Sequence, residues 1–323
     1  SDEGRKVLLT IDQNIQFIVE QSLDKAMAAT GSAAATAIVM DPKTGDVLAM
    51  VSRPTYNPNQ FWKGGPGEWR NRAVANVYEP GSTFKSIVVA AALNEGTVHP
   101  GQWFQDNGSI EVSGRRIQNW SGESYGAVHL EEIIKQSLNT GFVQIGLGLG
   151  GERLTRYARD FGFGRPTGID LAGEEEGILF EPKNMRDSDI ATMAIGQSIA
   201  VTPLQLVTAV SALANDGVLL KPHIIKEVQK SDGSVQQAYA TEVVRRVIRS
   251  DTAQTLKGLL EKVVSEGGGS KAAVKGYRIA GKTGTAEKLR EEGGGYYQGR
   301  YIASFAGFAP VEEPRIAVLV VLD

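Results

Sequence analysis

Patterns typical of β-strands occur near both ends of this chain, while helix patterns fill most of the segment between them. Two nearly continuous apolar runs, residues 36–41 (TAIVMD) and 46–52 (DVLAMVS), flank a turn at Pro42–Gly45 and predict a hairpin. This arrangement predicts an α+β fold, with a mainly antiparallel five-stranded sheet built from both ends of the chain, flanked by helices and a largely helical subdomain. Three further β-prone runs complete the sheet: 276–288, 300–310 and 314–323.

The helix patterns have recognisable starts and faces. A capping box from Thr10 to Gln13 predicts the beginning of an amphipathic helix. The segment Ser82–Gly96 is apolar on most faces, which predicts a buried helix. Residues 129–142 predict a helix that breaks near Ser137, and residues 53–80, rich in proline and glycine, predict a long surface loop. Two more helices are expected at 201–217 and 250–266.

Composition excludes several classes of function. The chain of 323 residues has 34 basic and 37 acidic residues and no long basic run with interleaved aromatics, so we expect no nucleic-acid partner. It has no cysteine, which excludes disulfides and thiolate ligands, and its 3 histidines are far apart, so we expect no metal and no cofactor. No run of about 18 apolar residues, the length of a membrane-spanning helix, is present.

The segment 276–288 (GYRIAGKTGTAEK) fits two different motifs. Gly276, Gly281, Lys282 and Thr283 match the spacing of a phosphate-binding loop. Such a loop follows a buried strand and leads directly into a helix, whereas the residues here are β-prone and lead to glycines and another strand. We therefore predict that Lys282 lies on a strand, and a nucleotide-binding protein stays the remote alternative.

The second interpretation concerns a reactive serine. Ser82 follows Glu-Pro-Gly at the start of the predicted buried helix, so its hydroxyl lies at the positive end of the helix dipole. Lys85 stands three residues later on the same face, within reach of Ser82. A nucleophile and its base can thus share one helical turn. Two other matches have plain structural explanations: Ser22 and Lys25 in the first helix, and Lys43–Gly45 in a turn.

With these residues the chain resembles, over nearly its whole length, the transpeptidase domain of class B high-molecular-mass penicillin-binding proteins of division, elongation or sporulation. The motifs occur in the family's order: Ser82-Thr83-Phe84-Lys85, Ser137-Leu138-Asn139 and Lys282-Thr283-Gly284-Thr285. Flanking stretches such as YEPGSTFK and IGQSIAVTPLQL are also similar.

The resemblance implies that residues 1–323 are one transpeptidase domain excised from a longer membrane-anchored protein. The family's anchor, its non-catalytic N-terminal region and its C-terminal helix are missing from this sequence. We therefore expect the native active site to lie on the outer side of the cytoplasmic membrane. The implied partners are peptidoglycan stem peptides ending in D-Ala-D-Ala, β-lactam antibiotics, a glycosyltransferase and other cell-wall assembly proteins.

The resemblance also implies a role for each motif residue. Ser82 attacks the D-alanyl-D-alanine carbonyl and passes the acyl group to an amine on a neighbouring stem. Lys85 acts as base when burial and the nearby Lys282 lower its pKa. The other implied roles are a proton relay (Ser137), substrate and Lys85 positioning (Asn139), carboxylate binding (Lys282, Thr283, Thr285), close substrate approach (Gly284) and an oxyanion hole of backbone N–H groups (Ser82, Thr285).

A β-lactam hydrolase or sensor on the same scaffold is the other alternative, because STFK and KTGT also suit class D β-lactamases. The Ser137-Leu138-Asn139 motif and the length of the chain favour the transpeptidase. We find no E-x-x-L-N segment of the class A hydrolase type.

Overall fold

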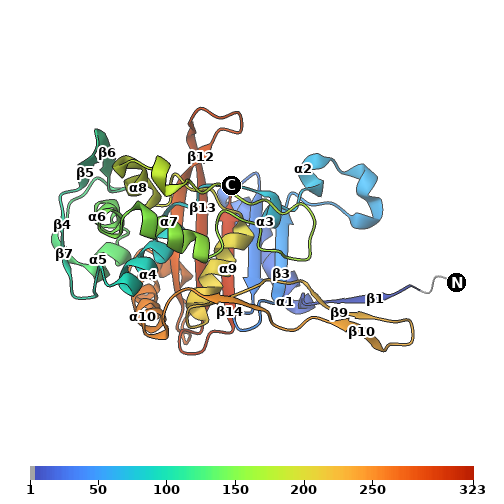
Figure 1. Cartoon of the computed structure of the whole chain (residues 1–323). Coiled ribbons are helices and arrows are strands. Elements are labelled where there is room, and N and C mark those ends of the chain that lie inside the picture. Colours follow the sequence, from blue (N-terminus) through green and yellow to red (C-terminus); the bar gives the residue numbers. More distant parts are fainter. Residues whose placement is uncertain (1–3) are drawn as a thin grey trace.

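The computed structural model describes residues 4–323, and its central feature is a five-stranded sheet. The strand order is β12-β13-β14-β2-β3 and every neighbouring pair is antiparallel (Figure 1). Pairing of β14 with β2 joins the C-terminal strands to the N-terminal hairpin. The predicted α+β fold is confirmed. The bounds of these strands are β2 (Ala35–Met40), β3 (Val47–Arg53), β12 (Ala280–Leu289), β13 (Tyr296–Ala309) and β14 (Ile316–Leu322).

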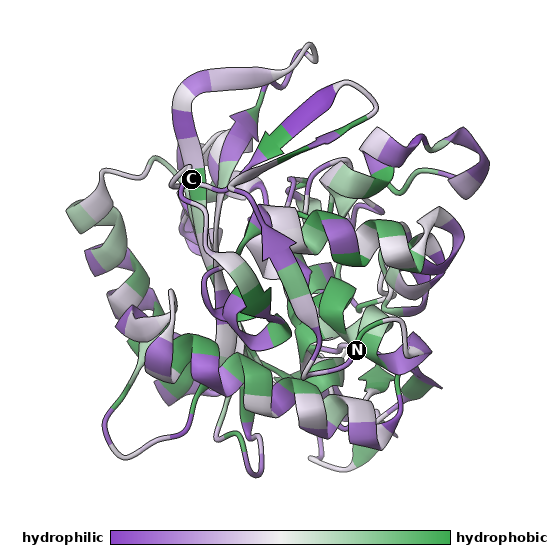
Figure 2. Ribbon diagram, turned by 90° about the vertical axis from the view of Figure 1, so that its left-hand side faces the viewer, coloured by the Kyte–Doolittle hydropathy of each residue, from purple (hydrophilic) through white to green (hydrophobic). Residues whose placement is uncertain are grey.

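Two helices cover opposite faces of the sheet. On one face, Leu23 of α1 (Gln13–Thr30) packs against Ala35, Ala37 and Val51. Because side chains alternate along a strand, Met40 points to the other face, where it contacts the fully buried helix α9 (Pro203–Ala214). Hydrophobic residues gather on the ribbons in the middle of the molecule (Figure 2).

The remaining long helices form the helical subdomain beside β12, the edge strand of the sheet (Figure 1). Helix α10 contacts β12 directly, and α4 packs against α6, α7 and α10. The bounds are α4 (Lys85–Glu95), α5 (Leu130–Lys135), α6 (Asn139–Leu149), α7 (Gly151–Asp160), α8 (Asp187–Met193) and α10 (Ser250–Glu266).

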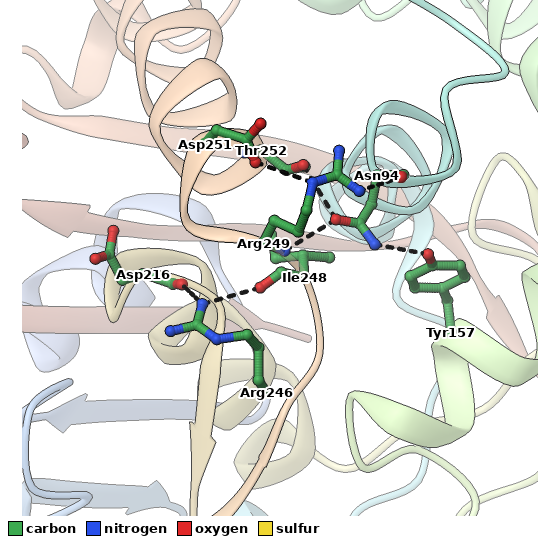
Figure 3. Close-up of polar contacts among 8 residues, drawn as sticks. All are labelled: Asn94, Tyr157, Asp216, Arg246, Ile248, Arg249, Asp251 and Thr252. Carbon is green, nitrogen blue, oxygen red and sulfur yellow. Dashed lines mark hydrogen bonds and ion pairs between the residues drawn. The ribbon is translucent and has the colours of Figure 1, made fainter.

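The C-terminal end of α4 is fixed by the side chain of Asn94 (Figure 3). Its Oδ1 accepts hydrogen bonds from the backbone N–H of Arg249 (2.9 Å) and from Thr252 Oγ1 (3.1 Å) at the start of α10. Its Nδ2 donates to the Tyr157 hydroxyl on α7 (2.8 Å). One amide therefore ties α4 to two neighbouring helices.

The predicted capping box at Thr10 is wrong. Helix α1 begins after Asp12, whose carboxylate accepts from the backbone N–H groups of Asn14 and Ile15. The Thr10 hydroxyl instead donates to the carbonyl oxygen of Val47 at 2.6 Å, so this threonine joins the incoming chain to β3.

Short elements interrupt the regions predicted as loop or helix. Residues 53–80 contain three helical turns, and the segment from α4 to α10, predicted as mainly helical, contains the eight short strands β4 to β11. Within residues 4–323, no helix has both the length and the apolarity needed to cross a membrane. The short helices are η1 (Pro58–Lys63), α2 (Pro66–Trp69), α3 (Arg72–Ala75), η2 (Gly81–Phe84), η3 (Pro182–Asn184) and η4 (Ser270–Ala272). The short strands are β1 (Lys6–Leu9), β4 (Trp103–Asp106), β5 (Ser109–Val112), β6 (Arg115–Gln118), β7 (Gly126–His129), β8 (Val218–Leu220), β9 (Ile225–Gln229), β10 (Val235–Ala238) and β11 (Val243–Arg246).

Candidate active site

A groove of about 780 Å³ separates the edge of the sheet from the helical subdomain. One wall is β12, and the other is formed by β6 together with the turn between α5 and α6. All predicted site residues except the buried Lys85 line this groove: Ser82, Ser137, Asn139, Lys282, Thr283, Gly284 and Thr285.

Ser82 lies in the helical turn η2, which leads directly into α4. The α-helix begins at Lys85 rather than at Ser82, but the backbone is already helical across this junction. The turn is tightly held from outside, because Gly81 donates its N–H to the carbonyl oxygen of Gly196 at 3.0 Å. A Cβ on Gly196 would lie 1.9 Å from the Gly81 oxygen, so only glycine fits at this contact.

Lys85 is 1% exposed and its amino group has three hydrogen-bond partners. Nζ donates to the carbonyl oxygen of Ser137 (3.0 Å), to Ser137 Oγ (2.9 Å) and to Asn139 Oδ1 (2.7 Å). Ser137 Oγ in turn donates to Ser82 Oγ at 3.3 Å. The hydrogen-bonded connection from Lys85 to Ser82 therefore runs through Ser137, whereas the sequence predicted a direct approach.

Both lysines of the site have depressed pKa values. Burial lowers the pKa of Lys85 well below its usual 10.5, and the positive charge of Lys282 lowers it further. Burial alone lowers the pKa of Lys282 to about 8. These are the two causes expected from the sequence, and they favour a neutral amine at Lys85.

The predicted break in the helix at 129–142 is confirmed. Helix α5 ends at Lys135 and α6 begins at Asn139, with Ser137 in the left-handed region (φ 54°) between them. Asn139 points both ways, since Oδ1 accepts from Lys85 and Nδ2 donates to the carbonyl oxygen of Gln118 on β6 at 3.0 Å. The Asn139 amide thus holds the α5–α6 turn against the hairpin formed by β5 and β6.

Lys282 lies within β12, 3% exposed, with Nζ donating to the carbonyl oxygen of Thr283 at 3.1 Å. The strand β13 follows, not a helix, and residues 276–279 precede the strand. The phosphate-loop interpretation is therefore wrong, because the backbone that would surround a phosphate is engaged in or next to a β-ladder.

Gly284 brings β12 close to η2, which carries the predicted nucleophile Ser82 and is called the nucleophile turn below. A Cβ at this position would lie 3.1 Å from the backbone nitrogen of Thr83 and 3.1 Å from Ser304 Oγ. The sequence predicted that glycine here admits a substrate strand; the structure shows that the chain's own Thr83 makes the close approach.

The three motifs meet in one groove, and the model of the penicillin-binding protein transpeptidase domain matches residues 35–323. The chain belongs to this family. It is 42% identical to stage V sporulation protein D of Bacillus subtilis, over 99% of this chain and 50% of that protein. It is 34% identical to the peptidoglycan D,D-transpeptidase FtsI of Escherichia coli, over 100% of this chain and 52% of that protein.

Solved transpeptidase structures share the fold as well. Penicillin-binding protein 3 of Mycobacterium tuberculosis, complexed with ampicillin, superposes with a TM-score of 0.93 at 34% identity, over 99% of this chain and 72% of that chain. The same protein complexed with aztreonam also gives a TM-score of 0.93. This transpeptidase domain spans about half the length of the curated relatives it matches.

Two carboxylates near the transpeptidase motifs were missed by the sequence. Asp106 is 1% exposed and accepts hydrogen bonds from Thr140, the residue after Asn139, and from Asn119, the residue after β6. Glu79, three residues before Ser82, is 8% exposed and accepts from Ser198 and Tyr296. Single acidic residues carry no periodic signal, whether at the end of a strand like Asp106 or before a turn like Glu79, and only the Glu-Pro-Gly context of Ser82 pointed to one of them.

Proposed function

We propose that this transpeptidase domain is a peptidoglycan D,D-transpeptidase that crosslinks stem peptides through an acyl-enzyme on Ser82. The observation that carries the proposal is the hydrogen-bonded connection from buried Lys85 through Ser137 to Ser82. A buried lysine with a lowered pKa can accept the proton of a serine hydroxyl near neutral pH. The names of the relatives, among them a peptidoglycan D,D-transpeptidase, support the same reaction.

In the proposed acylation, the proton of Ser82 moves to Lys85 through Ser137 as Oγ attacks the carbonyl carbon of the penultimate D-alanine. The backbone N–H groups of Ser82 and Thr285 stabilise the oxyanion, each by about 3–4 kcal/mol. When the peptide bond breaks, Ser137 returns the proton to the leaving nitrogen of the terminal D-alanine. An amine of a second stem then attacks the ester, loses its proton by the same route and releases Ser82.

The substrate contacts follow from the groove walls. We propose that the hydroxyls of Thr283 and Thr285 bind the terminal carboxylate, and that the ammonium group of Lys282 adds positive charge there. The Asn139 amide has one hydrogen beyond the one given to Gln118, and this hydrogen can bind the substrate backbone.

We further propose that residues 1–323 are the catalytic domain of a longer membrane-anchored protein. In that protein the groove faces the outer side of the cytoplasmic membrane, where a glycosyltransferase supplies nascent strands. The proposal is supported by relatives of which this chain covers about half.

Intact-mass spectrometry with benzylpenicillin tests the function. We expect one adduct, mapped by peptide digestion to Ser82 and absent from Ser82→Ala. The matched control is Ser22→Ala, which removes the serine of the other Ser-x-x-Lys sequence and should label as the wild type does. Full labelling of Ser82→Ala would reject the nucleophile assignment.

The pH dependence of acylation tests the base. Because Lys85 acts only as the neutral amine and its pKa lies well below 10.5, the acylation rate should rise with pH through a midpoint below that value. Stopped-flow rates with a fluorescent penicillin from pH 6 to 10 give the midpoint. Wild-type rates in Lys85→Met across this range would require a different base.

A class D-like hydrolase is the competing function, because apolar side chains, among them Val89, Ile134 and Phe142, lie behind Lys85, although the space between them has no room for a water molecule. Such an enzyme hydrolyses its acyl-enzyme with a carbamylated lysine, but Lys85 Nζ here lies in a polar setting, within hydrogen-bond distance of three oxygens of Ser137 and Asn139. We therefore expect an adduct that persists for at least about an hour. Steady turnover of a chromogenic cephalosporin, enhanced by bicarbonate, would assign the chain to the hydrolases.

A further inference from the structure

Glu79 holds a buried carboxylate beside the nucleophile turn that the proposed reaction does not use. It stands three residues before Ser82 and is 8% exposed. One oxygen, Oε2, accepts the backbone N–H of Ser198 at 2.7 Å, and the other, Oε1, accepts the Tyr296 hydroxyl at 2.5 Å. A buried carboxylate is costly to desolvate, so its retention here calls for a specific set of partners.

The two partners of Glu79 belong to the segments that enclose the nucleophile turn. Ser198 lies in the loop between α8 and α9, and Gly196 of this loop contacts Gly81 directly. Ser198 has φ 56°, unusual for a residue with a side chain, and its hydroxyl lies 2.7 Å from that of Thr192 on α8. The Glu79 carboxylate therefore holds this loop in a conformation that it does not adopt freely.

Tyr296 comes from the opposite side of the turn. It is the first residue of β13 and pairs with Leu289 at the end of β12, the strand that carries Lys282 to Thr285. Its hydrogen bond to Glu79 joins residues 217 positions apart in sequence. One side chain thus connects the start of the nucleophile turn to the loop on one side and to the β12–β13 hairpin on the other.

We propose that Glu79 is a positioning residue for acylation: its carboxylate fixes the distance between Ser82 and the β12 wall by binding Ser198 and Tyr296 at once. The inference rests on the proposed acylation of Ser82. Among the side chains, only a carboxylate accepts at two oxygens in this way, because a glutamine has one acceptor oxygen and one donor nitrogen. A fixed Ser82 matters because a displacement of about 1 Å can lower a rate about 10²-fold.

The positioning role makes specific predictions for acylation by a fluorescent penicillin. Glu79→Ala should lower the second-order rate constant about 10²-fold. Tyr296→Phe, which keeps the Ser198 contact, should lower it roughly 10-fold, and Glu79→Gln roughly 3- to 10-fold, because the Tyr296 hydroxyl can turn to accept from the new amide. The double variant Glu79→Gln/Tyr296→Phe should fall short of the product of the two single effects.

A matched control separates positioning from loss of stability. Tyr157→Phe removes a hydroxyl at the far end of α4 that donates to Glu95 and also accepts from Asn94. It should lower the melting temperature at least as much as Tyr296→Phe, which loses the Glu79 contact, and leave the acylation rate at the wild-type value. The pH midpoint of acylation should stay unchanged in the Glu79 variants, because burial and Lys282 lower the pKa of Lys85.

The outcomes distinguish this inference from the proposed function. Absence of acylation in the wild type would reject the function itself. Acylation of the wild type together with wild-type rates in Tyr296→Phe and Glu79→Gln would reject only the positioning role of Glu79. Equal rate losses in Tyr157→Phe and Tyr296→Phe would reduce the effect to stability and also overturn the inference.

Discussion

The two walls of the groove are built by different means. The β12 wall is the edge of a regular sheet, and each of its site residues is placed by backbone pairing with β13. The opposite wall is a turn and a short hairpin, placed by side-chain hydrogen bonds: Asn139 to Gln118, and Thr140 and Asn119 to Asp106. In the β12–β13 ladder, many residues share the hydrogen bonds that hold the wall in place. The opposite wall depends on a few buried polar groups.

Asp106 lies at the centre of this second wall, which side-chain hydrogen bonds hold in place. Its carboxylate accepts from Thr140 Oγ1 (2.6 Å), Asn119 Nδ2 (2.9 Å) and the backbone N–H groups of Gly108 and Tyr125 (both 2.9 Å). Burial alone raises the pKa of Asp106, but these hydrogen bonds outweigh it and lower the pKa below 3.8. The comparison therefore predicts that this wall is the more sensitive one to single substitutions.

The largest loss of stability is expected for Asp106→Ala. It leaves the donors around the carboxylate without an acceptor, which should lower the free energy of unfolding by roughly 3–5 kcal/mol. Urea denaturation measures the change. The control is Asp232→Ala, which removes an exposed turn carboxylate that accepts from Ser234 and should leave the unfolding midpoint close to that of the wild type.

The charge of Asp106 makes the stability of this wall depend on pH. Because the folded pKa of Asp106 is depressed, its contribution is complete at neutral pH and is lost as the pH falls below 3.8. The stability gap between wild type and Asp106→Asn should close in that range. A gap that is constant with pH would show that the charge of Asp106 does not hold the wall.

On the β12 wall, the substitution Lys282→Met is expected to raise the free energy of unfolding. A lysine with a pKa near 8 instead of 10.5 opposes folding below pH 8 by about 3 kcal/mol, and the methionine should recover this while abolishing efficient acylation. The gain should shrink as the pH rises from 8 toward 10.5, because the unfolded lysine then loses its proton too.

Lys43→Met is the matched control for this gain, because Lys43 belongs to the other Lys-Thr-Gly sequence and forms an ion pair with Glu313 at the surface. Thermal unfolding of both variants between pH 7 and 10 compares them. An equal gain in Lys43→Met would contradict a cost of burying Lys282.

The smallest effect is expected for Gly284→Ala, which tests the contact between the sheet wall and the nucleophile turn. The new methyl group would press on Thr83 and Ser304, and overpacking of this kind costs about 1–2 kcal/mol. Acylation should slow as the Ser82 turn moves.

Gly258→Ala provides a control of opposite sign. Gly258 lies on the exposed side of α10 with nothing within 4 Å of its Cβ position, so alanine there should stabilise the helix by roughly 0.5–1 kcal/mol. Wild-type stability in Gly284→Ala would show that the turn adjusts freely, and that β12 does not hold it.

The sequence predicted the local structure around the candidate site residues correctly. Ser82 and Lys85 lie within one helical turn, so their spacing alone indicated that they belong together. The strand position of Lys282 followed from alternating β-prone residues, and the break at Ser137 from its flanking helix patterns. The cap of α1 was assigned to Thr10 instead of Asp12, because the pattern did not reveal that Thr10 binds Val47.

What the sequence determined by itself is therefore several of the long helices, the five strands of the central sheet and the motif residues, since these depend on periodicity and on neighbours within a few positions. Only the tertiary structure decided how the motifs are held together: the hydrogen bonds of Ser137 to Lys85 and Ser82, the close approach of Gly284 to Thr83, and the contacts of Asp106 and Glu79. Some of these contacts join distant residues, 34 positions apart in Thr140–Asp106 and 217 positions apart in Tyr296–Glu79. A single polar side chain gives no periodic pattern in the sequence. Its partner depends on how the packed elements bring distant segments side by side.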